Sequence, residues 1–149
     1  MKNEEAKQLF LNGANCAQAV LCAFCKETGM DTETAMKIAS SFGGGMGRLR
    51  EVCGACSGMF MVAGLLDGYS SPDATTQKAE HYARIQMLAE KFKEKNGSII
   101  CRDLIAEGND TSPVPSERTD KYYKKRPCAE YVADAAQILE EYLKKEGRI

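Results

Sequence analysis

Apolar residues recur every three or four positions over most of the chain, which is the spacing of an amphipathic helix. The last such segment shows it best, with Val132, Ala135, Ile138, Leu139 and Tyr142 on one face. No segment shows the sustained alternation and hairpin turns of paired strands. The predicted helices cover residues 2–11, 16–28, a segment that begins at Asp31–Thr32, 53–66, 72–95, about 98–105 and 127–145.

One of these segments, 53–66, is rich in small and apolar residues and carries almost no charge. A helix that is polar on no face belongs in the interior of a protein. We therefore predict an all-α fold, a compact orthogonal bundle of six or seven helices around this buried central helix. Because no second composition or repeat interrupts the pattern, residues 1–149 are predicted to form a single domain.

Residues with strong positional preferences set the expected helix boundaries. Asn15 can cap the second helix, Ser71–Asp73 offers a cap, a first-turn proline and a favourable acid, and Ser98 can cap the short helix after it. Pro127 opens the last helix. The intervening residues 107–126 contain glycine, prolines, serines and threonines, and are predicted to form a long surface loop.

Charge and hydropathy restrict the partners. The 149 residues carry a formal net charge of −1, which argues against nucleic acid as a partner, so the basic run Lys121–Arg126 is interpreted as a solvated loop end. The longest apolar stretch, Met59–Leu66, is far shorter than the ~20 residues of a membrane-spanning helix. The acidic start of the chain is not typical of a targeting segment. We expect a cytoplasmic protein without membrane insertion.

Seven cysteines are many for such a chain, and their odd number argues against a disulfide framework. Cys16, Cys53, Cys101 and Cys128 each fall in the first turn of a different predicted helix. The unpaired N–H groups and the positive end of the helix dipole at that position stabilise a thiolate, the species that attacks disulfides and binds metals. We predict that these four cysteines form one site, although cysteine also packs well in any protein interior.

The other three cysteines support weaker hypotheses. Cys22 and Cys25 lie inside the second predicted helix among apolar residues, and packing explains them better than a zinc site shared with Cys53 and Cys56. Cys53 and Cys56 form a C-x2-C motif at a helix start, where the first thiol is activated and the second can resolve a mixed disulfide. The alternative for Cys56 is a packed core residue.

The glycine-rich segment before the central helix cannot be ordinary helix, because glycine loses too much backbone entropy there. Gly43, Gly44 and Gly45 are candidates to let the backbone approach a cofactor or a neighbouring helix closely. Arg48 and Arg50 beside them could balance the charge of thiolates or of a cluster, or could be solvated surface residues. The segment lacks the Gly-Lys-Ser/Thr ending of a phosphate-binding loop.

Five parts of the chain together resemble the C_GCAxxG_C_C family of redox-active proteins: Asn15–Val20, Phe42–Arg48, Cys53–Gly58, Cys101 and Cys128. The resemblance covers nearly the whole chain and implies that Cys16, Cys53, Cys101 and Cys128 are the family's signature cysteines. Related domains joined to cytochrome-type modules imply an iron–sulfur or electron-transfer role for some members. In the family the position of Cys56 is usually not cysteine, so its dithiol would be peculiar to this chain.

Two versions of a redox site follow. In the first, Cys16, Cys53, Cys101 and Cys128 ligate an iron–sulfur cluster, a version slightly favoured because four converging thiolates repel one another unless a cation neutralises them. In the second they cycle between thiols and disulfides, with Cys53 as nucleophile and Cys56, Cys16 or another cysteine resolving. Either would serve an oxidoreductase or an electron-transfer component with an unidentified redox partner protein. The alternative is a non-catalytic helical module with structural zinc or buried thiols that binds a protein partner.

Overall fold

The computed structural model describes residues 1–105 and 108–149, and the described chain is all-α. Seven helices were expected at most; the described residues form nine, with no strand longer than an isolated bridge. The helices are α1 (Lys2–Leu11), α2 (Cys16–Ala23), α3 (Cys25–Thr28), α4 (Thr32–Ser40), α5 (Gly54–Asp67), α6 (Thr75–Asn96), α7 (Cys101–Leu104), α8 (Asp120–Lys125) and α9 (Cys128–Lys145).

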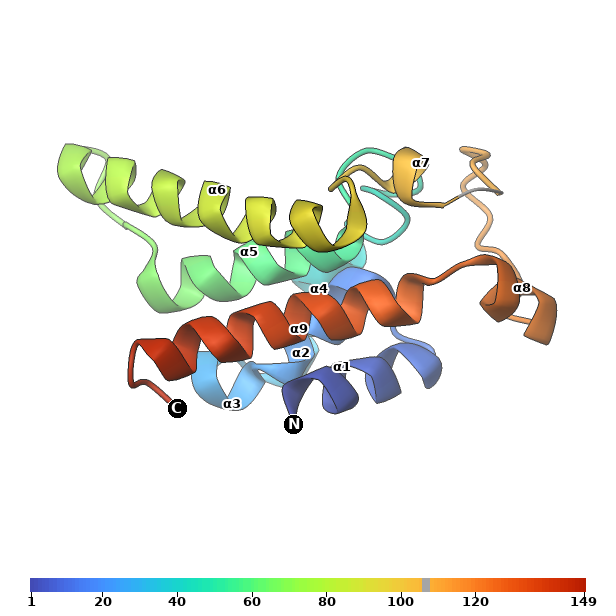
Figure 1. Ribbon diagram of the computed structural model, residues 1–149, viewed down its shortest axis with the longest axis horizontal. Coiled ribbons are helices and arrows are strands. Elements are labelled where there is room, and N and C mark those ends of the chain that lie inside the picture. The colour runs from blue at the N-terminus through green and yellow to red at the C-terminus, as the bar shows by residue number, and fades with distance from the viewer. Residues whose placement is uncertain (106–107) are drawn as a thin grey trace.

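The long helices run side by side along the length of the molecule (Figure 1). Helix α5 packs against α2, α6 and α9, and α1 closes the bundle against α2 and α9. Helices α2, α5 and α9 all begin toward the end of the molecule that also carries α7 and α8 (Figure 1). The starts of α2, α5 and α9 therefore lie toward the same end of the bundle as α7, although these segments are distant in the sequence.

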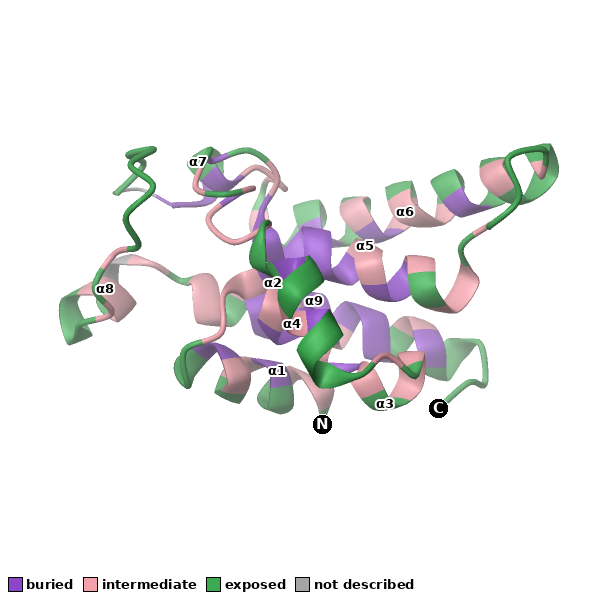
Figure 2. Cartoon of the chain, turned by 180° about the vertical axis from the view of Figure 1, so that it is seen from behind, coloured by how far each residue is buried: buried purple, intermediate pink, exposed green. Residues whose placement is uncertain are grey.

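The central position predicted for residues 53–66 is confirmed by α5, whose first six residues are all buried. Small side chains allow this burial: a Cβ atom on Gly58 would lie 2.8 Å from the carbonyl oxygen of Ala17 in α2. Buried residues concentrate on α2, α5 and the inner face of α9 (Figure 2). Close packing of backbone against backbone thus holds α2 and α5, and the cysteines at their starts, in fixed relation.

The single helix predicted over 16–28 is wrong at its centre, where the chain divides into α2 and α3. Phe24 leaves helical geometry, with φ −112° and ψ 16°, and its side chain is fully buried. Lys2 stabilises the break, because its ammonium group donates to the carbonyl oxygen of Ala23 and lies over the Phe24 ring. The amphipathic pattern continues through the break, so the sequence alone does not reveal it.

The predicted boundaries after α5 need two corrections. Ser71–Asp73 does not start α6; it forms a separate turn in which the Ser71 hydroxyl accepts from the Asp73 N–H, and the helix begins at Thr75. Of the loop predicted over 107–126, residue 107 lies outside the described residues, and 108–126 is not only loop, because Thr119 caps the short helix α8 by accepting from the Tyr122 N–H. Ser71 therefore stabilises a turn before the helix, and Thr119 caps a helix that the sequence analysis does not predict.

Candidate functional site

The four cysteines predicted to share a site line one cavity. Cys16, Cys101 and Cys128 are the first residues of α2, α7 and α9, and Cys53 is the residue directly before α5. All four border a cavity of about 70 Å³ at the end of the bundle where these helices begin. We call this space the cysteine cavity. The helix starts therefore converge in space, as the positions of the cysteines in the sequence suggested.

A short backbone pairing places two of the cysteines side by side. Val52 and Ile100 form an isolated antiparallel bridge. The N–H of Cys53 donates to the carbonyl oxygen of Ile99 at 2.7 Å, and the N–H of Cys101 donates to that of Glu51 at 2.6 Å. This pairing also explains why α7 begins at Cys101 and not nearer to Ser98, because Ile100 is extended in the bridge.

The glycine-rich segment packs its backbone against the cysteines. Gly44 and Gly45 border the cysteine cavity and have positive φ, which other residues adopt only with strain. A Cβ atom on Gly45 would lie 2.6 Å from the Cβ atom of Cys101, and one on Gly43 would lie 2.6 Å from the Asn15 amide nitrogen. Close approach to neighbouring segments thus accounts for these glycines; their proposed role in holding a cofactor stays a prediction.

Cys16 and Cys128 form the first of two thiol pairs. The Cys16 thiol donates a hydrogen bond to the Cys128 sulfur, which raises the pKa of Cys16 well above its usual value, with burial adding to the effect. The same hydrogen bond lowers the pKa of Cys128, and the positive charges of Arg126, Arg50 and Arg118 lower it further. Cys128 therefore ionises more readily than an ordinary thiol, and Cys16 ionises less readily.

Cys53 and Cys56 form the second pair, with the same asymmetry. The Cys56 thiol donates to the Cys53 sulfur and lowers the pKa of Cys53; the N–H groups of Ala55 and Cys56 at the start of α5 act in the same direction. The pKa of Cys56 is raised by that hydrogen bond and by burial. Cys56 is fully buried beneath Cys53 and does not border the cavity. The C-x2-C motif thus has the arrangement of an activated thiol with a second thiol behind it.

Of the two arginines that the sequence suggested, Arg50 lies in the cysteine cavity. It is 3% exposed, its Nε donates to the carbonyl oxygen of Asp110, and its Nη1 lies 3.9 Å from the Cys101 sulfur. Burial raises the pKa of Cys101, and the hydrogen bond and charge of Arg50 oppose that rise. Arg48 instead contacts the segment around Ser112. It donates to the carbonyl oxygen of Ser112 and lies 3.6 Å from the Asp110 carboxylate.

Sequence reasoning missed two further arginines that border the cavity, Arg118 and Arg126. Arg118 donates to the carbonyl oxygens of Phe10 and Ala14 and lies over the Phe10 ring. Arg126 lies over the ring of Tyr122. For Arg126 the signal is the basic and aromatic run Lys121–Arg126, although the near-zero net charge of the chain favours a solvated loop end; Arg118 lies outside this run.

Two of the thiols that line the cysteine cavity, those of Cys16 and Cys128, contact each other, whereas Cys53 contacts Cys56 behind the cavity wall. Four cysteines are a ligand set that iron–sulfur clusters and zinc accept. Across the described ranges, however, no three cysteine, histidine or acidic side chains lie together in a way that could hold one metal ion. The cluster and zinc hypotheses stay predictions, and the pairwise contacts fit thiol–disulfide chemistry more directly.

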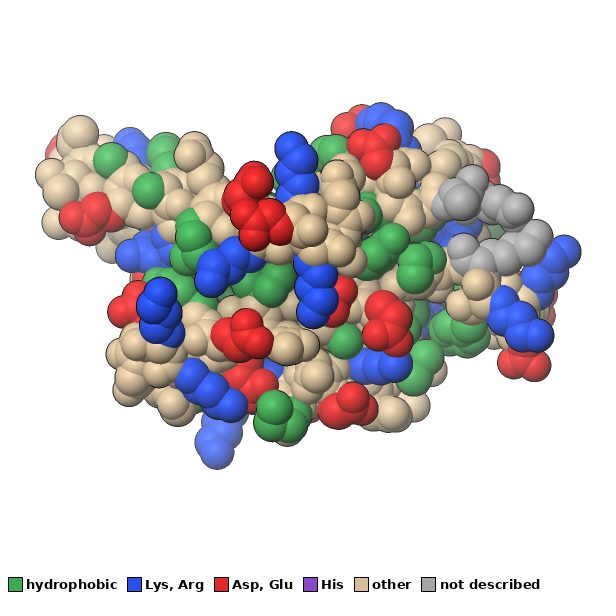
Figure 3. All heavy atoms as spheres, viewed as in Figure 1, with side chains coloured by type: hydrophobic (Ala, Val, Ile, Leu, Met, Phe, Trp, Pro, Cys, Tyr) green, Lys and Arg blue, Asp and Glu red, His purple; other side chains and the backbone are tan. Residues whose placement is uncertain are grey.

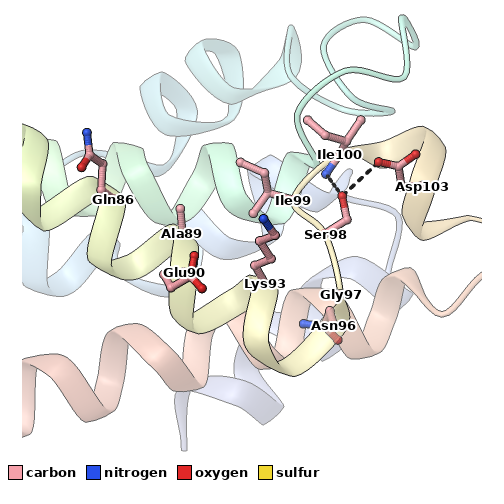
Figure 4. A pocket seen from close by; sticks show the side chains of 10 residues that line it. All are labelled: Gln86, Ala89, Glu90, Lys93, Asn96, Gly97, Ser98, Ile99, Ile100 and Asp103. Atoms are coloured by element: carbon pink, nitrogen blue, oxygen red, sulfur yellow. Dashed lines mark hydrogen bonds between the residues drawn. The ribbon is translucent and has the colours of Figure 1, made fainter.

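A larger hollow lies elsewhere, between the end of α6 and the start of α7 (Figure 4). It measures about 770 Å³ and is bordered by Glu90, Lys93 and Asp103 but by no cysteine. The Ser98 hydroxyl accepts from the Ile100 N–H and donates to the Asp103 carboxylate there (Figure 4). These contacts order the turn before α7, so the polar residues at this hollow have a structural role. We place the candidate site in the smaller cysteine cavity, where the thiols lie.

The remaining cysteines, Cys22 and Cys25, lie apart from the cysteine cavity at the division between α2 and α3. Both are half-buried and pack against the core, in partial agreement with the packing role expected from the sequence. They contact each other, and burial together with the neighbouring Cys25 raises the pKa of Cys22 to about 11. Their C-x2-C spacing equals that of Cys53 and Cys56, which makes them an internal reference for the candidate site.

Surface properties add two findings. Acidic and basic side chains intermingle on the face shown in Figure 3, without a broad area of one sign. No helix in the described part of the chain combines the length and the apolar character needed to span a membrane.

Fold and site together define a small all-α protein with a thiol-lined cavity at the convergent starts of its helices. The family described as "Putative redox-active protein (C_GCAxxG_C_C)" matches residues 14–142, and the chain belongs to this family. The resemblance seen in the sequence is thereby confirmed. No curated protein and no solved structure matches the chain.

Proposed function

We propose that the protein is a thiol–disulfide redox centre that exchanges electrons with a redox partner through two cysteine pairs, Cys53–Cys56 and Cys16–Cys128. The observation that carries the proposal is the pairwise contact of these thiols, in which one member of each pair has a lowered pKa and the other a raised pKa. An attacking thiol must ionise readily, whereas a resolving thiol can stay protonated until it is needed.

The chemistry uses Cys53 as the nucleophile. Its thiolate attacks a disulfide of the redox partner, forms a mixed disulfide and releases the partner's first sulfur as a thiolate, which takes up a proton. Cys56 then loses its proton and attacks the sulfur of Cys53, which releases the second partner thiol and closes the Cys53–Cys56 disulfide. The partner gains two electrons and two protons, and the cysteine pair loses both. Cys128 and Cys16 can perform the same exchange at the more accessible side of the cavity.

The test is a redox titration of anaerobically purified protein, with peptide mapping of the disulfides formed in glutathione buffers of graded ratio. We expect four of the seven thiols to disappear in two pairs, Cys53 with Cys56 and Cys16 with Cys128. Cys56→Ser should abolish the first disulfide and leave a long-lived mixed disulfide on Cys53. The matched control Cys22→Ser changes an equivalent C-x2-C motif and should leave both disulfides and their midpoints unchanged.

The same preparation separates the rival hypotheses. Stoichiometric iron and sulfide with visible absorbance would instead support an iron–sulfur cluster held by the four cysteines. Stoichiometric zinc, with a melting temperature that collapses in chelator, would support a structural metal site. Metal-free protein in which Cys16, Cys53, Cys56 and Cys128 all stay reduced at every buffer ratio would contradict the redox proposal and favour a partner-binding helical module.

A further inference from the structure

A second hollow adjoins the cysteine cavity and is lined by arginines. This groove measures about 320 Å³ and is bordered by Arg48, Arg50, Arg118 and Arg126. Three of these arginines also border the cysteine cavity, so the two spaces share a wall. We call it the arginine groove. Its volume is in the range of sites that bind small molecules.

The groove and the cavity have a one-sided charge. Their described linings contain four guanidinium groups and no aspartate or glutamate. Among the residues that the structure describes, the exposed carboxylate of Asp110 lies 3.6 Å from Arg48. Because the chain as a whole is almost neutral, this concentration of positive charge is local. Such a lining attracts an anion and repels a cation.

Arg50 provides the most specific observation. Its guanidinium is buried, and its Nη2 has no hydrogen-bond partner among the residues that the structure describes. Leaving a buried donor of a charged group unpaired is costly, so native proteins usually satisfy it with protein, water or a ligand. The other two nitrogens of Arg50 hold the Asp110 carbonyl oxygen and the Cys101 sulfur. The unpaired nitrogen is therefore held in place beside a thiol and ready for an acceptor.

The neighbouring arginines are also held in place. Arg118 is fixed by two backbone carbonyl oxygens and the Phe10 ring. Arg126 donates to the carbonyl oxygen of Gly108 and lies over Tyr122. Within the described part of the chain, neutral carbonyl partners orient these guanidinium groups and leave their charge uncancelled. A site that is ordered in this way loses little side-chain entropy when an anion binds.

We propose that the substrate of the redox site is a small disulfide whose organic part is negatively charged, bound with its anionic group in the arginine groove and on Arg50. This inference rests on the proposed function and specifies its substrate class. The cysteine cavity is too small for an entire organic molecule, so the anion remains in the groove and one sulfur of the disulfide enters the cavity. There the thiolate of Cys53 attacks it, and the leaving sulfur departs as a thiolate that takes up a proton.

The proposal is tested with two small disulfides as probes, one anionic and one neutral. One is 5,5′-dithiobis(2-nitrobenzoate), a disulfide with two carboxylates, and the other is 4,4′-dithiodipyridine, which is neutral at neutral pH. Stopped-flow absorbance measures how fast each probe oxidises the reduced protein at low and at high salt. We expect the ratio of the rate with the anionic probe to the rate with the neutral probe to be at least about tenfold higher for the wild type than for free cysteine. This ratio should fall with added salt.

Variants assign the preference to the groove. Arg50→Gln should lower the rate with the anionic probe about tenfold or more and change the rate with the neutral probe much less. The ratio of the two rates cancels any effect of Arg50 on thiol ionisation. Arg126→Gln, at the rim, provides a second variant if loss of buried Arg50 unfolds the protein. The matched control Arg102→Gln removes an exposed arginine paired with Glu51 outside both hollows and should change neither rate.

Two failures are distinguishable. If both probes oxidise the two cysteine pairs but Arg50→Gln and Arg126→Gln leave their rate ratio unchanged, the substrate inference is wrong and the redox function stands. If neither probe produces a Cys53–Cys56 or a Cys16–Cys128 disulfide, the redox function is wrong, and the substrate inference is overturned with it.

Discussion

The chain contains two C-x2-C motifs with opposite properties. Cys53 and Cys56 lie at the start of α5, inside the bundle and beside the cysteine cavity. Cys22 and Cys25 lie at the end of α2 and the start of α3, half-buried and packed against the core. In both motifs the two thiols contact each other. The spacing is therefore the same, but the surroundings of the cysteines differ.

Those surroundings determine which thiol ionises. The Cys56 thiol and the N–H groups of Ala55 and Cys56 at the start of α5 lower the pKa of Cys53. Cys22 is near the last turn of its helix, where the backbone presents carbonyl oxygens in place of N–H groups, and burial beside Cys25 raises its pKa to about 11. A C-x2-C motif thus indicates an activated dithiol only when its first cysteine meets the donors of a helix start.

The backbone near the two motifs should differ most in its tolerance of a side chain. Gly45, beside the cysteine cavity, and Gly29, after α3, have nearly equal φ of +70° and +76°. A Cβ atom on Gly45 would lie 2.6 Å from Cys101 and 2.8 Å from the Arg50 Cα atom, whereas one on Gly29 meets nothing within 4 Å. We expect Gly45→Ala to lower the free energy of unfolding by about 3 kcal/mol or more and Gly29→Ala by about 1 kcal/mol.

Urea denaturation of reduced protein measures both changes. Since the two positions share the cost of positive φ, the difference between the variants isolates the close approach of the glycine-rich segment to Cys101 and Arg50. Equal losses of stability would show that the segment does not pack against the cavity as described. The comparison would then lose its structural basis.

The next difference concerns thiol ionisation. At pH 7 a thiol with the pKa of Cys22, about 11, is ionised in only about one molecule in 10,000. We expect the pH profile of alkylation to place Cys53 below the ordinary thiol value of 9.0 and to show the rate of Cys22 still rising above pH 10. Quenched iodoacetamide labelling with mass spectrometry gives both profiles in one sample. Because each profile is scaled to its own maximum, slower access to buried Cys53 does not affect the comparison.

Replacing the donor sharpens this test. Cys56→Ala removes the hydrogen bond to Cys53 and should move its profile upward, whereas Cys25→Ala removes a neighbour that disfavours ionisation of Cys22 and should move that profile downward. Shifts in the same direction for both would contradict the assignment of roles within the two motifs.

Periodicity and helix-end residues predicted much of the fold. The apolar pattern identified α1, α4, α5 and α9 closely, and the glycine-rich segment was recognised as non-helical. Cysteines at helix starts identified the residues that line the cavity, because a thiol at such a position has a physical reason to be there. These features are local, so a sequence displays them directly.

Contacts between distant segments could not be predicted in this way. The break at Phe24 depends on Lys2, which binds the Ala23 carbonyl oxygen from 21 residues away. Arg118 reaches the cavity because carbonyl oxygens of Phe10 and Ala14 hold it, a contact that no local pattern indicates. The sequence therefore predicts the cysteines that line the cavity, but it does not predict that Arg118 and Arg126 border it.

The smallest expected effect is a dependence of stability on pH at the surface motif. Folding raises the pKa of Cys22 from 9.0 to about 11, so the folded state binds the thiol proton more tightly than the unfolded state does. The resulting stabilisation is fully present below about pH 9 and is lost as the pH rises toward 11. Because the side chain is partly exposed to solvent, we expect less than about 1 kcal/mol. The free energy of unfolding of reduced wild type, minus that of Cys22→Ser, should therefore be constant from pH 7 to 9 and decline above it. A difference that increased above pH 9 would mean that the folded protein stabilises the Cys22 thiolate, and the contrast between the two motifs would disappear.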